Sequence, residues 1–245
     1  MSLIDGIRHF FRAKGAHNDI VEIDGFWVPR MEMQRYAAMP RYKGIPDQDV
    51  KKLEKVIQLV APHTCALDIG ANIGTTASLL SKHFQTVHAF EPAYDLCAAL
   101  RKNLAGDEHA TAHQCAIGEE AGKVFLTQYS THGQVSHLST GAPIENTQWR
   151  KVGPIPLRTI DSFKFQDVSL MKIDVEGFEG PVVRGAAETI KRCRPAVLVE
   201  QAGNEQKCFG LPLNEASAFL ESLGMIQHPN APEKMKKDRL YIFEN

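Results

Sequence analysis

The sequence predicts an α/β fold in which a mostly parallel sheet is covered by helices on both faces. Three observations support this prediction. From residue 48 onward, short apolar segments alternate with amphipathic segments of helical spacing. A glycine-containing turn follows the first apolar segment, where a strand of such a sheet leads into a helix. The chain of 245 residues is long enough for one large domain and an additional segment.

The predicted elements of this domain follow in chain order. Helices are predicted at Asp49–Val60, from about Thr75, and at Tyr94–Asn103, Val182–Cys193 and Asn214–Leu223. Strands are predicted at Cys65–Ile69, Val87–Phe90, Ala110–Ile117, Val168–Ile173, Ala196–Val199 and Leu240–Phe243, with Lys123–Tyr129 as an added hairpin arm.

Residues 1–47 are predicted to form an N-terminal extension, and residues 48–245 the main domain. Apolar positions between Leu3 and Phe11 have helical spacing, which predicts an amphipathic helix packed on its own domain, on a membrane or on a partner subunit. Residues 20–29 predict a hairpin with its turn at Asp24 and Gly25. The extension is expected to act as a lid or as an arm in a homodimer, and the sequence leaves both open.

Composition narrows the class of protein. A net charge of −1 and a pI near 6.8 give no long-range attraction for nucleic acid, so no nucleic-acid partner is expected. No apolar stretch approaches the ~20 residues that a membrane span needs, and no signal peptide is expected at the amino terminus. The five scattered cysteines indicate reduced thiols. A cytoplasmic protein without a transmembrane segment is therefore expected.

The turn after the first strand is the first sign of a ligand site. Gly70 and Gly74 allow the backbone N–H groups to approach a ligand where the strand ends and the helix begins. Asn72 stands where a dinucleotide-binding turn has its middle glycine. Asparagine tolerates left-handed backbone angles, but its side chain would crowd a diphosphate. The turn therefore fits S-adenosylmethionine, which has no phosphate, better than a dinucleotide.

An acidic residue follows the second strand. Glu91 lies 21 positions after Gly70 (91 − 70) and is followed by Pro92. A carboxylate at this strand end can accept hydrogen bonds from both hydroxyls of a ribose. Together with Asp68 and the turn, Glu91 and Pro92 predict a site for a nucleoside-containing cofactor.

Several blocks of sequence, including this turn and strand end, form a recognisable set. They are Asp68–Gly74, Ala89–Pro92, Leu157–Asp161, Leu170–Glu179, Arg184–Ala186 and Pro195–Glu200. In these blocks, across roughly residues 65–205, the chain resembles the FkbM family of S-adenosylmethionine-dependent methyltransferases. The run Lys172–Gly177 is the most specific part of the resemblance.

The resemblance implies a Rossmann-like class I methyltransferase fold. It also implies S-adenosylmethionine as the cofactor, and a small-molecule acceptor such as a hydroxyl of a sugar, a polyketide or a related secondary metabolite. By matching position, the resemblance gives cofactor-binding roles to Asp68, Gly70, Asn72, Gly74 and Glu91.

The candidates for catalysis follow the later strands. Asp174 and Glu176 come after one predicted strand and Glu200 ends another, so all three can reach the crevice at the carboxyl ends of the strands. Asp174 is expected to contact the methionine amino group of the cofactor or to act toward the acceptor hydroxyl. Glu176 is either a second catalytic candidate or a cap for the helix beginning near Phe178. A divalent cation held by these carboxylates is possible but not favoured.

A polar loop is predicted at Tyr129–His137, and His132 within it is a candidate for substrate contact or for the general base. His137 is expected to be solvated. Arg41 and Tyr42 are expected to lie at the surface, with cofactor binding as the alternative.

Two other classes of function stay open at this point. One is a nucleotide-dependent oxidoreductase on a similar sheet, which Asn72 disfavours. The other is a catalytically silent protein that binds the cofactor without turnover, which the presence of Asp68, Glu91 and Asp174 disfavours.

Overall fold

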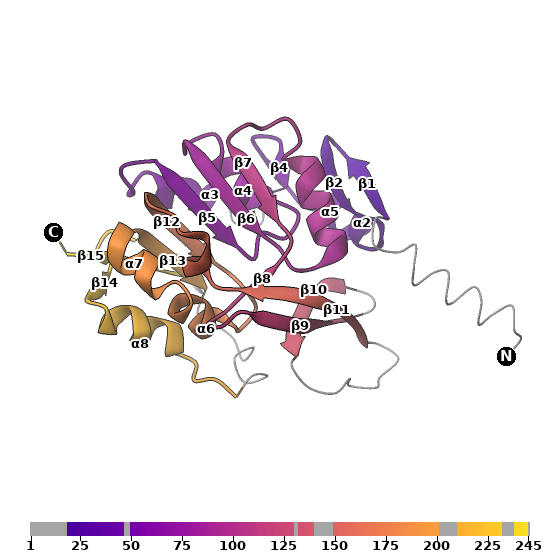
Figure 1. Cartoon of the computed structure of the whole chain (residues 1–245). Coiled ribbons are helices and arrows are strands. Elements are labelled where there is room, and N and C mark those ends of the chain that lie inside the picture. Colours follow the sequence, from indigo (N-terminus) through magenta and orange to yellow (C-terminus); the bar gives the residue numbers. More distant parts are fainter. Residues whose placement is uncertain are drawn as a thin grey trace, which may run out of the picture.

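The computed structural model describes residues 19–46, 50–129, 132–139, 149–200, 210–231 and 238–244 (Figure 1). For residues 127–129, 132–139 and 149–151 it describes the backbone alone. The helix expected between Leu3 and Phe11 lies outside the described residues.

A seven-stranded sheet forms the centre of the molecule, in the order β14-β15-β13-β12-β5-β6-β7. Neighbours from β13 to β7 are parallel, whereas β15 runs antiparallel to β13 and β14. The strand order reverses between β5 and β12, as in doubly wound sheets. The strands are β5 (Cys65–Ile69), β6 (Thr86–Phe90), β7 (Ala110–His113), β12 (Val168–Ile173), β13 (Ala196–Glu200), β14 (Met225–Gln227) and β15 (Asp238–Phe243).

Helices cover both faces of this sheet, as the sequence predicted (Figure 1). Along β12, Leu170 packs with the first group of helices, whereas Met171 and Ile173 pack with the second. This alternation follows from the period of two residues in a strand and explains why β12 is apolar on both faces. The first group is α3 (Val50–Ile57), α4 (Thr75–Leu80) and α5 (Tyr94–Asn103), and the second is α6 (Glu179–Arg184), α7 (Ala187–Cys193) and α8 (Glu215–Ser222). None of the helices in the described ranges is long and apolar enough to cross a membrane.

The prediction of one continuous helix at Val182–Cys193 is wrong. The structure has two helices, α6 and α7, with a break near Gly185. A Cβ atom on Gly185 would lie 1.9 Å from the carbonyl oxygen of Gly118, so the chain passes too close for a side chain there. The carboxylate of Asp161 then accepts the N–H groups of Glu188 and Thr189 at 3.1 and 2.8 Å, which starts α7 afresh.

A second sheet, in the order β10-β9-β11-β8, lies beside the first. It confirms the hairpin arm at Lys123–Tyr129 but corrects two expectations. The predicted strand Ala110–Ile117 divides into β7 and β8, because the chain passes from one sheet to the other. The predicted loop Tyr129–His137 overlaps strand β10, whose polar residues are tolerated because β10 is an edge strand paired with β9. The strands are β8 (Ala116–Ile117), β9 (Gly122–Tyr129), β10 (His132–Ser139) and β11 (Trp149–Arg158).

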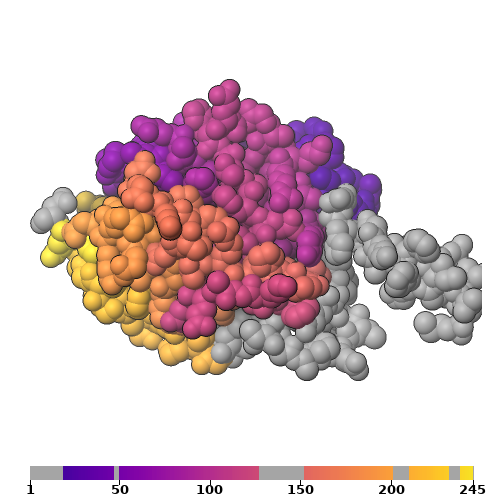
Figure 2. Space-filling view, in the orientation of Figure 1, coloured from indigo at the N-terminus to yellow at the C-terminus, as the bar shows by residue number. Residues whose placement is uncertain are grey.

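The N-terminal hairpin is confirmed as β1 (Ile20–Ile23) and β2 (Phe26–Pro29). Asp24 and Gly25 both have positive φ angles, 49° and 79°, as a two-residue hairpin turn requires. In the sequence colours, the indigo hairpin lies against the magenta region that contains α5 (Figures 1 and 2). The elements that follow are α2 (Met33–Ala37), β3 (Arg41–Tyr42) and β4 (Ile45–Pro46), and their buried residues join the same core as α3–α5. The role as a lid or a dimer arm stays a prediction.

Candidate functional site

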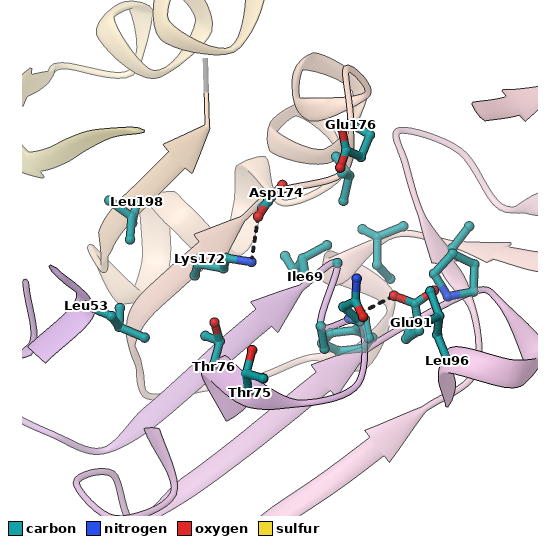
Figure 3. Close-up of a pocket in the computed structure, with 18 of the residues that line it drawn as sticks. Leu53, Ile69, Thr75, Thr76, Glu91, Leu96, Lys172, Asp174, Glu176 and Leu198 are labelled. Carbon is teal, nitrogen blue, oxygen red and sulfur yellow. Dashed lines mark hydrogen bonds and ion pairs between the residues drawn. The ribbon is translucent and has the colours of Figure 1, made fainter. Parts of the chain in front are cut away.

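An open pocket lies at the carboxyl ends of β5, β6 and β12 (Figure 3). Its wall includes Gly70–Asn72 after β5, Glu91 and Pro92 after β6, and Asp174–Glu176 after β12. Open α/β sheets bind their ligands at this point, where the strand order reverses. The space between these residues is about 1440 Å³, which includes open solvent.

The turn after β5 has the backbone conformation that its sequence indicated. Gly70, Asn72 and Gly74 all have positive φ angles, of 85°, 53° and 90°. A Cβ atom on Gly70 would lie 1.8 Å from the carbonyl oxygen of Asp174, so glycine is needed where the β5 and β12 loops meet. Gly74 is outside the pocket wall and precedes α4, where its lack of a side chain leaves space for Leu100.

Glu91 is buried at one end of the pocket and held by backbone donors. Its two carboxylate oxygens accept the N–H groups of Asn72 and Ala93 at 2.9 and 2.8 Å. Burial raises its pKa to about 7, although these two hydrogen bonds act in the opposite direction. A carboxylate oxygen can accept more than one hydrogen bond, so Glu91 fits a ribose with two adjacent hydroxyls.

The other end of the pocket is organised around Lys172 of β12. Its ammonium group lies 3.2 Å from Asp174 Oδ2 and 3.5 Å from Asp68 Oδ1. Burial alone would lower the pKa of Lys172, but the charges of Asp174 and Asp68 outweigh it and raise that pKa. Lys172 therefore stays protonated. Figure 3 shows Lys172 and Asp174 on one side of Ile69 and Glu91 on the other.

Asp68 lies in β5 and is not part of the pocket wall. Its side chain has no exposed surface, and burial raises its pKa above the ordinary value, a shift that the charge of Lys172 opposes only in part. The sequence predicted a cofactor-binding role for Asp68. In the structure, Asp68 reaches the pocket through Lys172.

Asp174 and Glu176 both line the pocket, as predicted. Glu179 Oε1 accepts the N–H groups of Val175 and Gly177, which lie in the loop before α6. The capping role considered for Glu176 stays a prediction. Glu179 is 2% exposed and begins α6. Its carboxylate fixes the loop that presents Asp174 and Glu176.

The remaining predicted residues lie elsewhere. Glu200 ends β13 outside the pocket wall, whereas Asp238, which pairs with it in β15, is part of the wall. His132 and His137 lie in β10, and their side chains are outside the described part of the chain.

Arg41 and Tyr42 are not in the wall either. Arg41 donates a hydrogen bond to the carbonyl oxygen of Ile23, and the hydroxyl of Tyr42 donates to Glu54.

Two functional features were missed by the sequence reasoning. Lys172 was part of a recognised motif, but its contact with Asp68 depends on β12 pairing with β5. Tyr36 of α2 also lines the pocket, and its hydroxyl donates to Asn72 Oδ1 at 2.9 Å. No local pattern could have indicated a contact between positions 36 residues apart.

The carboxylates near the pocket were also considered as ligands of a cation. Within the described ranges, no group of three or more His, Cys, Asp and Glu side chains is placed to hold a metal ion. Asp68 and Asp174 face the ammonium of Lys172, which occupies the position between them.

The doubly wound sheet, its glycine turn and the acidic end of its second strand define an α/β protein with a pocket at the switch point of the sheet. A family model described as the methyltransferase FkbM domain matches residues 68–227. The chain therefore belongs to the FkbM family of S-adenosylmethionine-dependent methyltransferases and has their Rossmann-like fold. This finding decides against the nucleotide-dependent oxidoreductase.

Individual relatives agree with the family. The chain is 25% identical to the 2-O-methyltransferase NoeI of Sinorhizobium fredii, over 77% of this chain and 84% of that protein. It is 36% identical to the 31-O-demethyl-FK506 methyltransferase FkbM of Streptomyces tacrolimicus, over 38% of this chain and 36% of that protein. A solved methyltransferase FkbM of Methylobacillus flagellatus aligns with 98% of this chain and 60% of that chain, at 15% identity and a TM-score of 0.49. That structural likeness is too distant to add to the assignment.

Proposed function

We propose that this chain transfers the methyl group of S-adenosylmethionine to a hydroxyl oxygen of a small molecule, such as a sugar, a polyketide or a related secondary metabolite. The observation that carries the proposal is one pocket that joins Glu91, at a nucleoside-type end, to the carboxylates of Asp174 and Glu176. The relatives named as O-methyltransferases support a hydroxyl acceptor.

The residues that would hold the cofactor are those of the turn and of the β6 end. The backbone of Gly70 and Asn72 would lie along it, Glu91 and Pro92 would bind its ribose end, and Asp174 would lie near its methionine end. When bound, S-adenosylmethionine supplies a methyl group on a sulfonium, which is a good leaving group. The protein then has to orient the acceptor oxygen and exclude water.

Asp174 is the proposed general base. An alcohol that keeps its proton is a poor nucleophile. A positioned base that removes this proton raises the reaction rate about 10²–10⁴-fold. The Asp174 side chain lines the pocket and is 39% exposed, while its Oδ2 faces Lys172. The ion pair holds this carboxylate at the pocket wall, where an acceptor would bind. Glu176, which also lines the pocket, is the second candidate. A role for His132 stays a prediction.

A divalent cation is not part of the proposal. The ammonium of Lys172 already lies between the carboxylates of Asp68 and Asp174, so a second cation there would meet like charge. We expect methyl transfer to proceed in EDTA at its full rate. Activity that is lost in EDTA and restored by Mg²⁺ would overturn this expectation.

The first experiment is calorimetric titration of the purified protein with S-adenosylmethionine, S-adenosylhomocysteine and NAD. Micromolar binding of both sulfur compounds and no binding of NAD is the expected result. Binding of NAD alone would overturn the proposal.

The second experiment tests turnover with S-adenosylmethionine labelled in its methyl group. Hydroxylated acceptors, among them sugars and macrolide alcohols, are compared with amine and peptide acceptors. Label in an ether product supports the proposal. Label in an N-methyl product contradicts the hydroxyl acceptor. Cofactor binding without label in any acceptor of either class would favour a catalytically silent binding protein.

A further inference from the structure

The N-terminal segment reaches the proposed cofactor site through a chain of hydrogen bonds. The hydroxyl of Tyr36 donates to Asn72 Oδ1 at 2.9 Å, and the backbone N–H of Asn72 donates to Glu91 Oε2 at 2.9 Å. Only one residue therefore separates the Tyr36 hydroxyl from the carboxylate proposed to bind the ribose. Tyr36 is 2% exposed, so its hydroxyl is fixed by packing as well as by this bond.

A second tie joins the same segment to the same turn. The side-chain amide of Asn103, at the end of α5, accepts the N–H of Trp27 at 2.6 Å and donates to its carbonyl oxygen at 2.8 Å. The same amide nitrogen donates to the carbonyl oxygen of Ile73 at 2.7 Å. Asn103 thus ties strand β2 to Ile73, the residue after Asn72. This tie holds the N-terminal segment, including α2, in place beside the turn.

The contact between Tyr36 and Asn72 also accounts for an asparagine in this turn. Asn72 has a φ angle of 53°, a conformation that costs a residue with a side chain more than it costs glycine. The side-chain oxygen of Asn72 accepts both the Tyr36 hydroxyl and the N–H of Ile73, the latter at 2.7 Å. These two bonds fix the side chain where a glycine would leave open space.

The hydroxyl of Tyr36 is a permanent donor. Burial raises its pKa above its ordinary value, and the carboxylate of Glu32 raises it further. Arg35 acts in the opposite direction and forms an ion pair with Glu32 at 2.9 Å. The phenol therefore stays protonated at any pH at which the enzyme is assayed, and Asn72 Oδ1 always has its donor.

We propose that Tyr36 is a positioning residue for the sulfonium cofactor, acting through Asn72 on the orientation of Glu91. This inference rests on the proposed function. It adds the segment before residue 68, where the family match begins, to the cofactor site. The core of α2 and the hairpin is then needed for affinity as well as for stability.

The test is a double-mutant cycle on the affinity for S-adenosylhomocysteine, measured by calorimetry on the full chain. Tyr36→Phe keeps the ring and removes the hydroxyl, and we expect its dissociation constant to rise about fivefold, the effect of one hydrogen bond. Asn72→Gly permits the left-handed turn and removes the acceptor. The double variant should bind no more weakly than Asn72→Gly alone.

Tyr42→Phe is the matched control, because Tyr42 donates to Glu54 Oε2 at 2.6 Å, outside the pocket wall. It should leave the dissociation constant unchanged. In turnover, Tyr36→Phe should raise KM for S-adenosylmethionine and leave kcat unchanged, which a loss of folded protein would not do. Thermal melts of every variant measure any loss of folding separately.

Three results would overturn the inference. An unchanged dissociation constant in folded Tyr36→Phe would overturn it alone. A fivefold effect that persists in the Asn72→Gly background would show that Tyr36 does not act through Asn72. No binding by the wild-type chain would overturn the proposed function first, and the inference with it.

Discussion

The two ends of the pocket hold their carboxylates in different ways. At one end, Glu91 is buried and receives two backbone N–H groups. At the other, Asp68 and Asp174 share the ammonium of Lys172. Backbone dipoles fix a carboxylate without adding a charge, so burial still raises the pKa of Glu91 to about 7. An ammonium adds a full opposite charge. The Glu91 end can therefore titrate near neutral pH, whereas at the Lys172 end an ammonium holds the carboxylate proposed as the general base.

The largest effect is expected from changing Asp174, the proposed general base. Asp174→Asn should lower kcat about 10²–10⁴-fold, because the amide cannot accept a proton from the acceptor. The measurement is methyl transfer to the acceptor found with the labelled cofactor, with Glu188→Gln, an exposed residue of α7, as the control. A weaker affinity for S-adenosylmethionine with unchanged kcat would instead assign Asp174 to the methionine amino group. No change in either would remove Asp174 from the site.

The next effect is on stability at the Lys172 end. Lys172→Met removes the cation and leaves Asp68 buried without it, so we expect a loss of about 3–5 kcal/mol in the free energy of unfolding. Urea denaturation measures it. Lys191→Met is the matched control, since the pair between Lys191 and Glu188 is exposed and should contribute less than about 1 kcal/mol. Equal losses in the two variants would show that the buried Asp68 does not depend on the ammonium of Lys172.

A substitution of Glu91 should weaken the binding of the cofactor. Glu91→Ala removes a charged acceptor, and we expect the dissociation constant of S-adenosylhomocysteine to rise about 10–100-fold, the effect of hydrogen bonds to a charged group. Calorimetry measures the change, and Glu119→Ala at the surface serves as the control. If Glu91→Ala lowered kcat and left the affinity intact, the roles of the two ends would have to be exchanged.

The smallest effect is a pH dependence that belongs to Glu91. Only the ionised carboxylate accepts both ribose hydroxyls, so affinity should fall as the pH falls through about 7. Between about pH 8 and pH 6 the affinity should fall about tenfold, because a single carboxylate takes up its proton over this range. Stability should change in the opposite sense. The pKa of Glu91 in the folded protein is raised above the ordinary value of 4.5. The contribution of Glu91 to stability is therefore fully present below pH 4.5 and is lost as the pH rises through about 7.

Glu91→Gln separates this titration from others. The variant should bind more weakly than the wild type at high pH and show a flat profile over the same range. A profile in Glu91→Gln that still falls below pH 7 would assign the titration to another group.

The sequence predicted those features of the site that depend on neighbouring positions in the chain. The strands Cys65–Ile69 and Val168–Ile173 were predicted with the bounds that the structure has, because each is a short buried apolar run between turn residues. Gly70, Asn72, Glu91, Pro92, Asp174 and Glu176 were predicted and all line the pocket, because residues at the ends of parallel strands meet at one edge.

The failures have a common cause in contacts between distant segments. The break between α6 and α7 depends on Gly185 meeting Gly118 and on Asp161 starting the new helix. The strand β10 depends on its pairing with β9, since its polar sequence has no strand pattern of its own. Local propensity has little weight against such interactions.

The sequence by itself determined the fold class, the family and the strand ends that carry the site, since periodicity and turn residues are properties of neighbouring positions. Tertiary structure alone decided how each carboxylate is held. Asp68 pairs with Lys172 because β5 and β12 are adjacent in the sheet. Tyr36 reaches Asn72 because the N-terminal segment packs on the same core. Charge balance and hydrogen bonding act over a few ångströms in space, and the folded chain sets those distances.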